Sequence, residues 1–158
     1  MRRKFIRLSM VTVLLVLVFG PAVLAAEKLA PEPYYEWKVE GFAIDAPIGG
    51  RVGNAENGRK IAVARKKGNC IACHVMPIPE QEFLGNVGPP LTGVASRLTE
   101  GRIRLNIVDE KQINPITVMP GYYRDPRHFN QVRKSFKGKT VLTAQEIEDV
   151  IAYLMTLK

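Results

Sequence analysis

The chain has 158 residues, with 23 Lys and Arg against 15 Asp and Glu, which gives a formal net charge of +8. Four of the basic residues and none of the acidic ones lie within residues 1–26, so the rest of the chain has 19 basic against 15 acidic residues, a surplus of four. Because this surplus is small, the composition favours docking to acidic protein surfaces over binding to nucleic acid.

Residues 1–26 have the pattern of a cleaved signal peptide. A basic start precedes an apolar run over residues 8–19, which Pro21 then interrupts. A membrane-spanning helix needs about 20 apolar residues, and this run is shorter. We therefore expect cleavage after Ala25 or Ala26 and a soluble periplasmic protein, by an export route that the sequence leaves open.

Residues 27–53 are rich in proline, glycine and aromatic residues, and we predict that they form an extended arm. The aromatic side chains can pack on the chain's own domain or cover a partner subunit. Residues 54–158 are then a single domain, because a mature chain of this size suits one hydrophobic core.

Four segments have apolar residues at helical spacing, and the last of them carries the clearest signal. It begins with a capping box, Thr143 and Glu146, followed by an apolar stripe to residue 157. Small residues on one face of the segment 54–69 predict a helix that another helix can cross closely. A third helix is predicted over residues 99–108. A fourth is predicted to start at Asp125-Pro126, and its Phe129, Val132 and Phe136 share one face. No alternating apolar pattern of strand length occurs, so we predict an all-α fold.

The sequence Cys70-Ile-Ala-Cys73-His74 carries the strongest chemical signal. Two thiols separated by two residues on a helical turn point to the same side, where they can add to the two vinyl groups of one haem. His74 then lies beneath the same porphyrin plane and can bind the iron. We therefore predict one covalently bound haem c, attached through Cys70 and Cys73, with His74 as an axial ligand.

Three other interpretations of the two cysteines are weaker. A thioredoxin-like dithiol would follow a strand in a βαβ unit, and no such unit precedes Cys70. A structural zinc site would need a second pair of ligands, yet the only other histidine is His128 and no cysteine is left. A disulfide across so short a loop would do little to stabilise a whole domain.

Electron transfer with little geometric change requires a sixth iron ligand, for which four residues are candidates. Met76 lies too near His74 in sequence to reach the other face of the haem, Met155 is most simply a core residue, and His128 has the features of a surface histidine. Met119 lies in a loop stiffened by two prolines and well separated from Cys70, and we predict that it is the ligand. A thioether ligand stabilises the ferrous state and raises the reduction potential.

These motifs, in this order, resemble the class I cytochrome c family. The match runs from about residue 54 to the end and includes the haem motif, the Gly88-Pro89-Pro90-Leu91 segment, Arg97, the Met119-Pro120 loop and the capped last helix. The resemblance implies that the Pro89 carbonyl accepts a hydrogen bond from His74 and fixes its ring. It also implies that Arg97 pairs with a haem propionate. A turn proline and a solvated arginine remain the structural alternatives.

Six segments, spread over almost the whole mature chain, carry a narrower pattern: 68–74, 79–83, 88–91, 107–109, 114–123 and 138–150. Together they resemble the SoxX family, the monohaem subunits of SoxAX sulfur-oxidation cytochromes. This resemblance implies a heterodimer with a SoxA-like haem subunit, which couples thiosulfate to a cysteine of a SoxYZ-like carrier (L-cysteine S-thiosulfotransferase). It also implies that this chain takes up the electrons and passes them to a downstream acceptor.

The cysteine count places the sulfur chemistry elsewhere. Haem attachment consumes both Cys70 and Cys73, so no free thiol remains in the chain to accept sulfur. With both axial positions filled, the iron has no open place for substrate. We therefore expect a non-catalytic electron-transfer subunit of an enzyme complex, and a free-standing cytochrome c shuttle to a terminal oxidase is the alternative that the same haem site supports.

Overall fold

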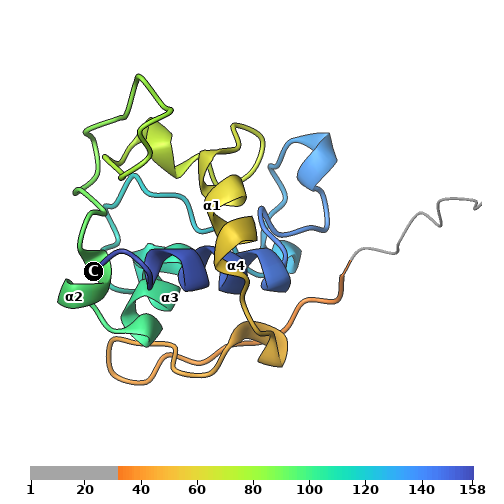
Figure 1. Ribbon diagram of the computed structural model, residues 1–158. Coiled ribbons are helices and arrows are strands. Elements are labelled where there is room, and N and C mark those ends of the chain that lie inside the picture. Colours follow the sequence, from red (N-terminus) through yellow and green to blue (C-terminus); the bar gives the residue numbers. More distant parts are fainter. Residues whose placement is uncertain (1–31) are drawn as a thin grey trace, which may run out of the picture.

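The structure, a computed structural model, describes residues 32–158 and is helical in this range (Figure 1). The predicted signal peptide and the first five residues of the predicted arm lie outside the described residues. In the described part the only β pairing is an isolated bridge between Glu40 and Ala43, so the all-α prediction is confirmed. None of the helices within 32–158 is long and apolar enough to cross a membrane. The helices are α1 Ala55–Val63, α2 Val94–Arg97, α3 Glu100–Asp109 and α4 Ala144–Leu154, joined by the short 3-10 turns η1 Ile48–Gly50, η2 Cys70–Ala72, η3 Glu110–Gln112, η4 Pro126–His128 and η5 Lys134–Phe136.

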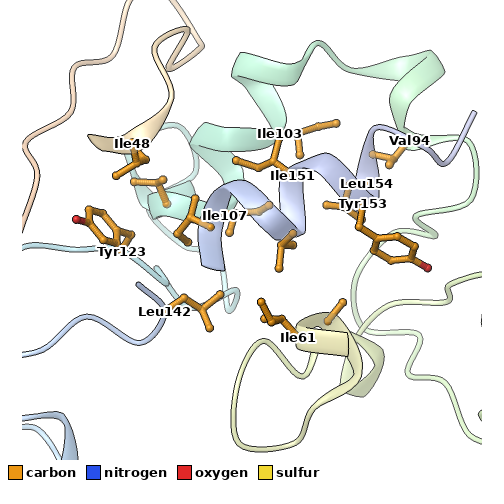
Figure 2. Packing of buried hydrophobic residues seen from close by; sticks show 14 of the residues in the cluster. Ile48, Ile61, Val94, Ile103, Ile107, Tyr123, Leu142, Ile151, Tyr153 and Leu154 are labelled. Atoms are coloured by element: carbon orange, nitrogen blue, oxygen red, sulfur yellow. The ribbon is translucent and has the colours of Figure 1, made fainter. Parts of the chain in front are cut away.

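Helix α4 lies at the centre of the fold, with α1 on one side and α3 on the other (Figure 2). It starts with the predicted capping box, in which Thr143 Oγ1 accepts from the Glu146 amide and Glu146 accepts from the Thr143 amide at 2.9 Å. Its apolar residues Ile147, Val150 and Ile151 are buried completely or almost completely. The capped, strongly amphipathic segment therefore forms the helix that the sequence predicts, and its ends are fixed locally.

The close crossing of α1 and α4 depends on Gly58, as the small residues of this segment predicted. A Cβ atom at Gly58 would lie 1.9 Å from the carbonyl oxygen of Asp149, so only glycine allows the two backbones to approach. The helix is shorter than the predicted 54–69, because the backbone at Ala64 becomes extended. The chain then turns back, and the Gly68 amide donates to the Ile61 carbonyl at 3.2 Å. This return brings Cys70 against the end of α1.

A buried ion pair joins α3 and α4 to the arm. Arg104 and Glu148 are 1% and 3% exposed, and Arg104 Nη2 lies 2.9 Å from Glu148 Oε2. Glu148 Oε1 also accepts from the Ile48 amide at 2.8 Å, and Arg104 Nη1 donates to the Ile44 carbonyl at 2.8 Å. Both charged groups thus bond to the arm, which favours one packing of three segments, and Glu100 is a second partner of Arg104.

The aromatic residues of the arm pack on the chain's own domain, around Tyr123. The Tyr34 ring stacks on the Tyr123 ring with centroids 5.2 Å apart. The Tyr35 amide donates to Tyr123 Oη at 2.9 Å, and Trp37 Nε1 donates to the Tyr123 carbonyl at 3.2 Å. Phe42, in contrast, is 69% exposed. Of the two alternatives for the arm, packing on the parent domain holds for Tyr34, Tyr35 and Trp37.

Replacing Tyr123 with phenylalanine should loosen the arm while keeping the aromatic stacking. The Tyr35 amide loses its acceptor, and a hydrogen bond of this kind contributes about 1 kcal/mol. Hydrogen exchange should show faster exchange at the Tyr35 amide. Tyr34→Phe is the matched control, because it keeps the acceptor of that amide; equal exchange in both variants would contradict the assignment of this contact.

The predicted helix starting at Asp125-Pro126 is wrong. The segment contains only η4 and η5, and the Phe129 backbone between them is extended. The Asp125 side chain does cap a turn, by accepting from the Arg127 amide at 2.9 Å, but the Phe129 ring packs against the Arg124 guanidinium at 4.4 Å. No core surface receives the expected apolar face, so the helix has no packing energy to stabilise it.

Candidate functional site

The predicted haem-attachment motif lies on a tight turn directly after the return of the chain at Gly68. Asn69 precedes η2 in the left-handed conformation, with φ 49°. The Cys70 carbonyl accepts from the Cys73 amide at 3.1 Å and from the His74 amide at 2.9 Å. These bonds hold Cys70, Cys73 and His74 on one helical turn, as the spacing predicts. Both cysteines are half-buried and neither forms a disulfide.

The environment of the thiols disfavours reactive dithiol chemistry. Burial, together with the neighbouring Cys73 thiol, raises the pKa of Cys70 to about 11. Redox-active cysteines instead have thiol pKa values below the ordinary range, because the thiolate is the nucleophile. The structure therefore supports the sequence argument against a thioredoxin-like site.

The loop after the motif closes on it through two glycines. The Gly85 amide donates to the Ile71 carbonyl at 2.7 Å, and the Gly88 amide donates to the Cys73 carbonyl at 2.8 Å. A Cβ at Gly85 would lie 2.0 Å from the Ala72 carbonyl oxygen, and one at Gly88 would lie 2.3 Å from Cε1 of His74. The loop backbone thus lies directly against the turn at Gly85 and against the imidazole ring at Gly88. A side chain at either position would overlap these atoms.

The next residue of this loop orients the imidazole. His74 Nδ1 lies 2.7 Å from the Pro89 carbonyl oxygen, which can only accept, so Nδ1 carries the hydrogen. The other nitrogen, Nε2, is then the one available to a metal. A carbonyl partner of this kind fixes the tautomer and the ring orientation of a metal-binding histidine and raises its basicity.

A Gly88→Ala substitution should displace the His74 ring, because the added methyl group overlaps the ring atoms. We expect a changed Soret spectrum and a shifted reduction potential, with haem still attached. Asn86→Ala in the same loop is the control, since Asn86 is exposed and should leave both quantities unchanged. An alanine at Gly88 with the spectrum of the wild type would show that the ring has room to move.

The loop that carries Met119 is held beside the attachment turn. Met119 is half-buried against the core, and its amide donates to Thr117 Oγ1 at 3.2 Å. Three residues later, Tyr122 Oη donates to the Gly68 carbonyl at 2.7 Å. Burial and the neighbouring Cys70 and Cys73 raise the pKa of Tyr122, so its hydroxyl stays protonated and remains a donor. Tyr122 thereby joins the Met119 loop to the chain two residues before Cys70.

Arg97, on α2, contacts the same loop as Pro89. Its guanidinium donates to the Thr92 carbonyl at 2.6 Å and to the Pro90 carbonyl at 2.7 Å. These contacts stiffen the loop that orients His74. Its pairing with a haem propionate stays a prediction.

The residues set aside as iron ligands lie in other environments. Met76 is 2% exposed within the core, and Met155 is the half-buried C-cap residue of α4. The His128 side chain is 78% exposed, near Asp125. These positions match the core and surface roles that the sequence suggested for them.

The comparison with family models decides the family. The model described as cytochrome c matches residues 55–158, which is the whole domain from α1 to the end. The chain belongs to the cytochrome c family. Its half-buried thiols on one turn and its oriented imidazole fit the covalently bound haem c, with iron, that this family carries.

Among solved structures, this cytochrome is similar to a chain of SoxXA from P. pantotrophus. The two are 37% identical, with a TM-score of 0.70, and the match covers 78% of this chain and 95% of that chain. The cytochrome is therefore a SoxX-like member of class I, as the sequence resemblance implied. No curated protein matches it.

Two residues of this cytochrome's site were not predicted from the sequence. Gly85 is important because of a backbone approach that becomes visible only in three dimensions. Tyr122 acts through a bond to a residue 54 positions earlier. The available signals were weak: a second glycine shortly before Gly88, and a tyrosine in the loop of Met119.

Proposed function

We propose that this cytochrome is the electron-accepting subunit of a periplasmic SoxAX-type complex that oxidises thiosulfate. The observation that supports this most directly is the similarity to SoxXA over 95% of the matched chain, together with the His74 to Pro89 contact at the haem motif. The proposed partners are a SoxA-like haem subunit, a SoxYZ-like carrier that binds transiently, and a downstream electron acceptor. Residues 1–26 would be removed on export, leaving the arm 27–53 and the domain 54–158.

The site residues have separate roles in this proposal. Cys70 and Cys73 hold the haem, and His74 and Met119 are the axial ligands. Pro89 holds a proton on Nδ1 of His74 and keeps the ring in one orientation, which limits the rearrangement that accompanies electron transfer. Haem, when bound, supplies a one-electron ferric/ferrous couple.

Exposed apolar side chains flank the site on both sides. Phe83 and Val87 lie in the loop that closes on His74, and Ile116 and Val118 lie in the loop of Met119; their exposed fractions run from 68% to 90%. Large apolar side chains on both flanks of one site are typical of a surface that a haem or another chain covers. In this proposal the permanent partner covers the part of this surface that the haem does not, whereas a shuttle would dock weakly over a smaller and more polar surface.

Sulfur chemistry belongs to the partner in this proposal. The chain has two cysteines, and haem attachment consumes both. No thiol is left to accept a sulfur atom from thiosulfate or from a carrier protein. We therefore assign catalysis to the SoxA-like chain and electron uptake to this one.

Affinity isolation of the mature protein from its own periplasm tests the proposal. We expect a second haem chain to co-purify in a one-to-one complex, and deletion of the gene should abolish thiosulfate-dependent cytochrome reduction. Recovery of a free monomer, with unchanged thiosulfate-dependent reduction in the deletion strain, would overturn the proposal in favour of the shuttle.

A further inference from the structure

The segment from residue 124 to residue 141, called here the basic loop, contributes nothing to the hydrophobic core. Tyr123 and Leu142, which flank it, are both 1% exposed, but no residue between them is among the buried core residues or the partly buried ones that pack against the core. The Leu142 amide donates to the Tyr122 carbonyl at 3.0 Å and closes the base of the loop. Figure 1 shows this loop projecting on the side of the molecule away from α2. Long loops without packing of their own are usually functional.

The charge of the basic loop is strongly one-sided. It has six basic residues and one acidic residue, Asp125. Two of the basic residues are neutralised locally, because Arg124 pairs with Asp109 and Arg127 pairs with Asp125. Within residues 32–158 the other four take part in no ion pair and are all exposed: Arg133, Lys134, Lys137 and Lys139.

The base of the loop adjoins the haem-attachment turn. Tyr122 Oη donates to the Gly68 carbonyl at 2.7 Å, and Gly68 lies two residues before Cys70. A protein bound to the basic loop would therefore be held on the same side as this turn. Proximity of this kind matters because electron-transfer rates fall steeply with the distance between redox centres.

The composition of the loop favours an acidic protein over an anionic membrane. Segments that bind membrane surfaces combine basic residues with large apolar side chains that insert. Here the Phe129 ring packs against Arg124, Phe136 is half-buried, and the most exposed large apolar residues are Val132 and Val141, at 38% each. Exposed, unpaired cations with little apolar surface are typical of steered, transient protein docking.

We propose that the basic loop is the docking surface for an acidic redox protein that takes the electron from this cytochrome. This inference rests on the electron-transfer function proposed above. The apolar flanks of the site are then free for the permanent partner, while the acceptor binds and leaves at the loop. Haem held by Cys70, Cys73 and His74 would supply one electron, which the oxidised centre of the acceptor would take up, with no bond formed or broken and no proton transferred.

Stopped-flow oxidation of the reduced complex tests the loop with probes of known charge. The probes are hexacyanoferrate(III), the trivalent tris(phenanthroline)cobalt cation and a blue-copper protein with an acidic surface. In the variant Lys134→Gln, Lys137→Gln, Lys139→Gln, oxidation by the two negatively charged probes, hexacyanoferrate(III) and the blue-copper protein, should slow about tenfold at low salt. Oxidation by the cobalt cation should not slow, and the difference from the wild type should shrink as salt is raised.

The matched control is Lys38→Gln, Lys60→Gln, Arg102→Gln, which removes the same charge from the arm, α1 and α3. It should change the rates less than about twofold, because charges outside the loop are distant from the docked probe and are screened. Equal slowing in both variants, or no slowing in the loop variant, would overturn the docking surface while leaving electron transfer intact. Failure of the wild-type complex to undergo reduction and reoxidation would instead refute the electron-transfer function. Loop-dependent binding to phosphatidylserine vesicles, without loop-dependent oxidation, would assign the loop to a membrane and also overturn the proposal.

Discussion

Replacing Met119 with alanine is expected to leave the haem attached and to lower the reduction potential. The proposed covalent links through Cys70 and Cys73 do not depend on this side chain, which is half-buried against the core. If Met119 is the sixth ligand, its loss removes a thioether that stabilises the ferrous state. Axial ligands set haem potentials over a range of roughly 0.8 V, so we expect a decrease on the order of 0.1 V, together with an open coordination position that binds added cyanide or imidazole.

Spectroelectrochemical titration of the purified protein measures this effect, and Met155→Leu provides a control. Met155 is also a half-buried methionine, but it caps α4, so its replacement should leave the potential unchanged. If Met119→Ala has the wild-type spectrum and potential, the sixth ligand is a different residue. If Met155→Leu instead lowers the potential, that residue is the ligand.

Replacing Glu148 with alanine is expected to destabilise the whole domain. Arg104, which is 1% exposed, would lose its buried partner and keep only Glu100, whose side chain is 54% exposed, and the Ile48 amide would lose its acceptor. Removal of one member of a buried ion pair costs about 3–5 kcal/mol. Because domains are stable by only about 5–15 kcal/mol, this is a large part of the free energy of unfolding. Guanidinium unfolding, followed by Trp37 fluorescence, measures it.

Two further variants separate the buried pair from a general charge effect. Glu56→Ala removes an exposed partner of Lys60 and should cost less than about 1 kcal/mol. The double variant Glu148→Leu, Arg104→Met removes both charges and should recover most of the lost stability, since an apolar pair needs no compensating charge. A single Glu148→Ala variant as stable as Glu56→Ala would mean that Glu100 alone compensates the charge of the buried Arg104.

Local signals predicted the elements that local interactions fix. The capping box at Thr143 and Glu146 forms as the sequence implies, because its hydrogen bonds join residues three apart. The spacing of the haem motif is similarly decided within one turn. The segment after Asp125 failed as a helix because its apolar face would have needed a packing surface, and sequence spacing carries no information about whether one exists. Sequence spacing likewise did not show where α1 ends. The helix stops at Val63, because the chain must turn back there toward Cys70.

The chemistry proposed for the candidate site came from the sequence, but only some of the residues that hold the site in place did. Residue type and spacing were sufficient to name His74 and Met119 as candidates, and the family resemblance added Pro89. Gly88 was noticed as part of a family segment, but its function is to leave space for the His74 ring, which depends on where the loop returns. Tyr122 contacts a backbone carbonyl, and any residue could supply that carbonyl. Contacts of these two kinds leave no pattern in one sequence.

The position of Glu148 has a consequence for how the protein matures. Its bond to the Ile48 amide joins residues 100 positions apart, and the bond between the Asn54 amide and Asp149 joins residues 95 positions apart. Contacts of such long sequence separation require the loop between them to close first. The bonds that hold Cys70, Cys73 and His74 on one turn join residues three and four positions apart and need no such closure. The proposed haem attachment at this turn therefore does not require the domain to be completed by α4.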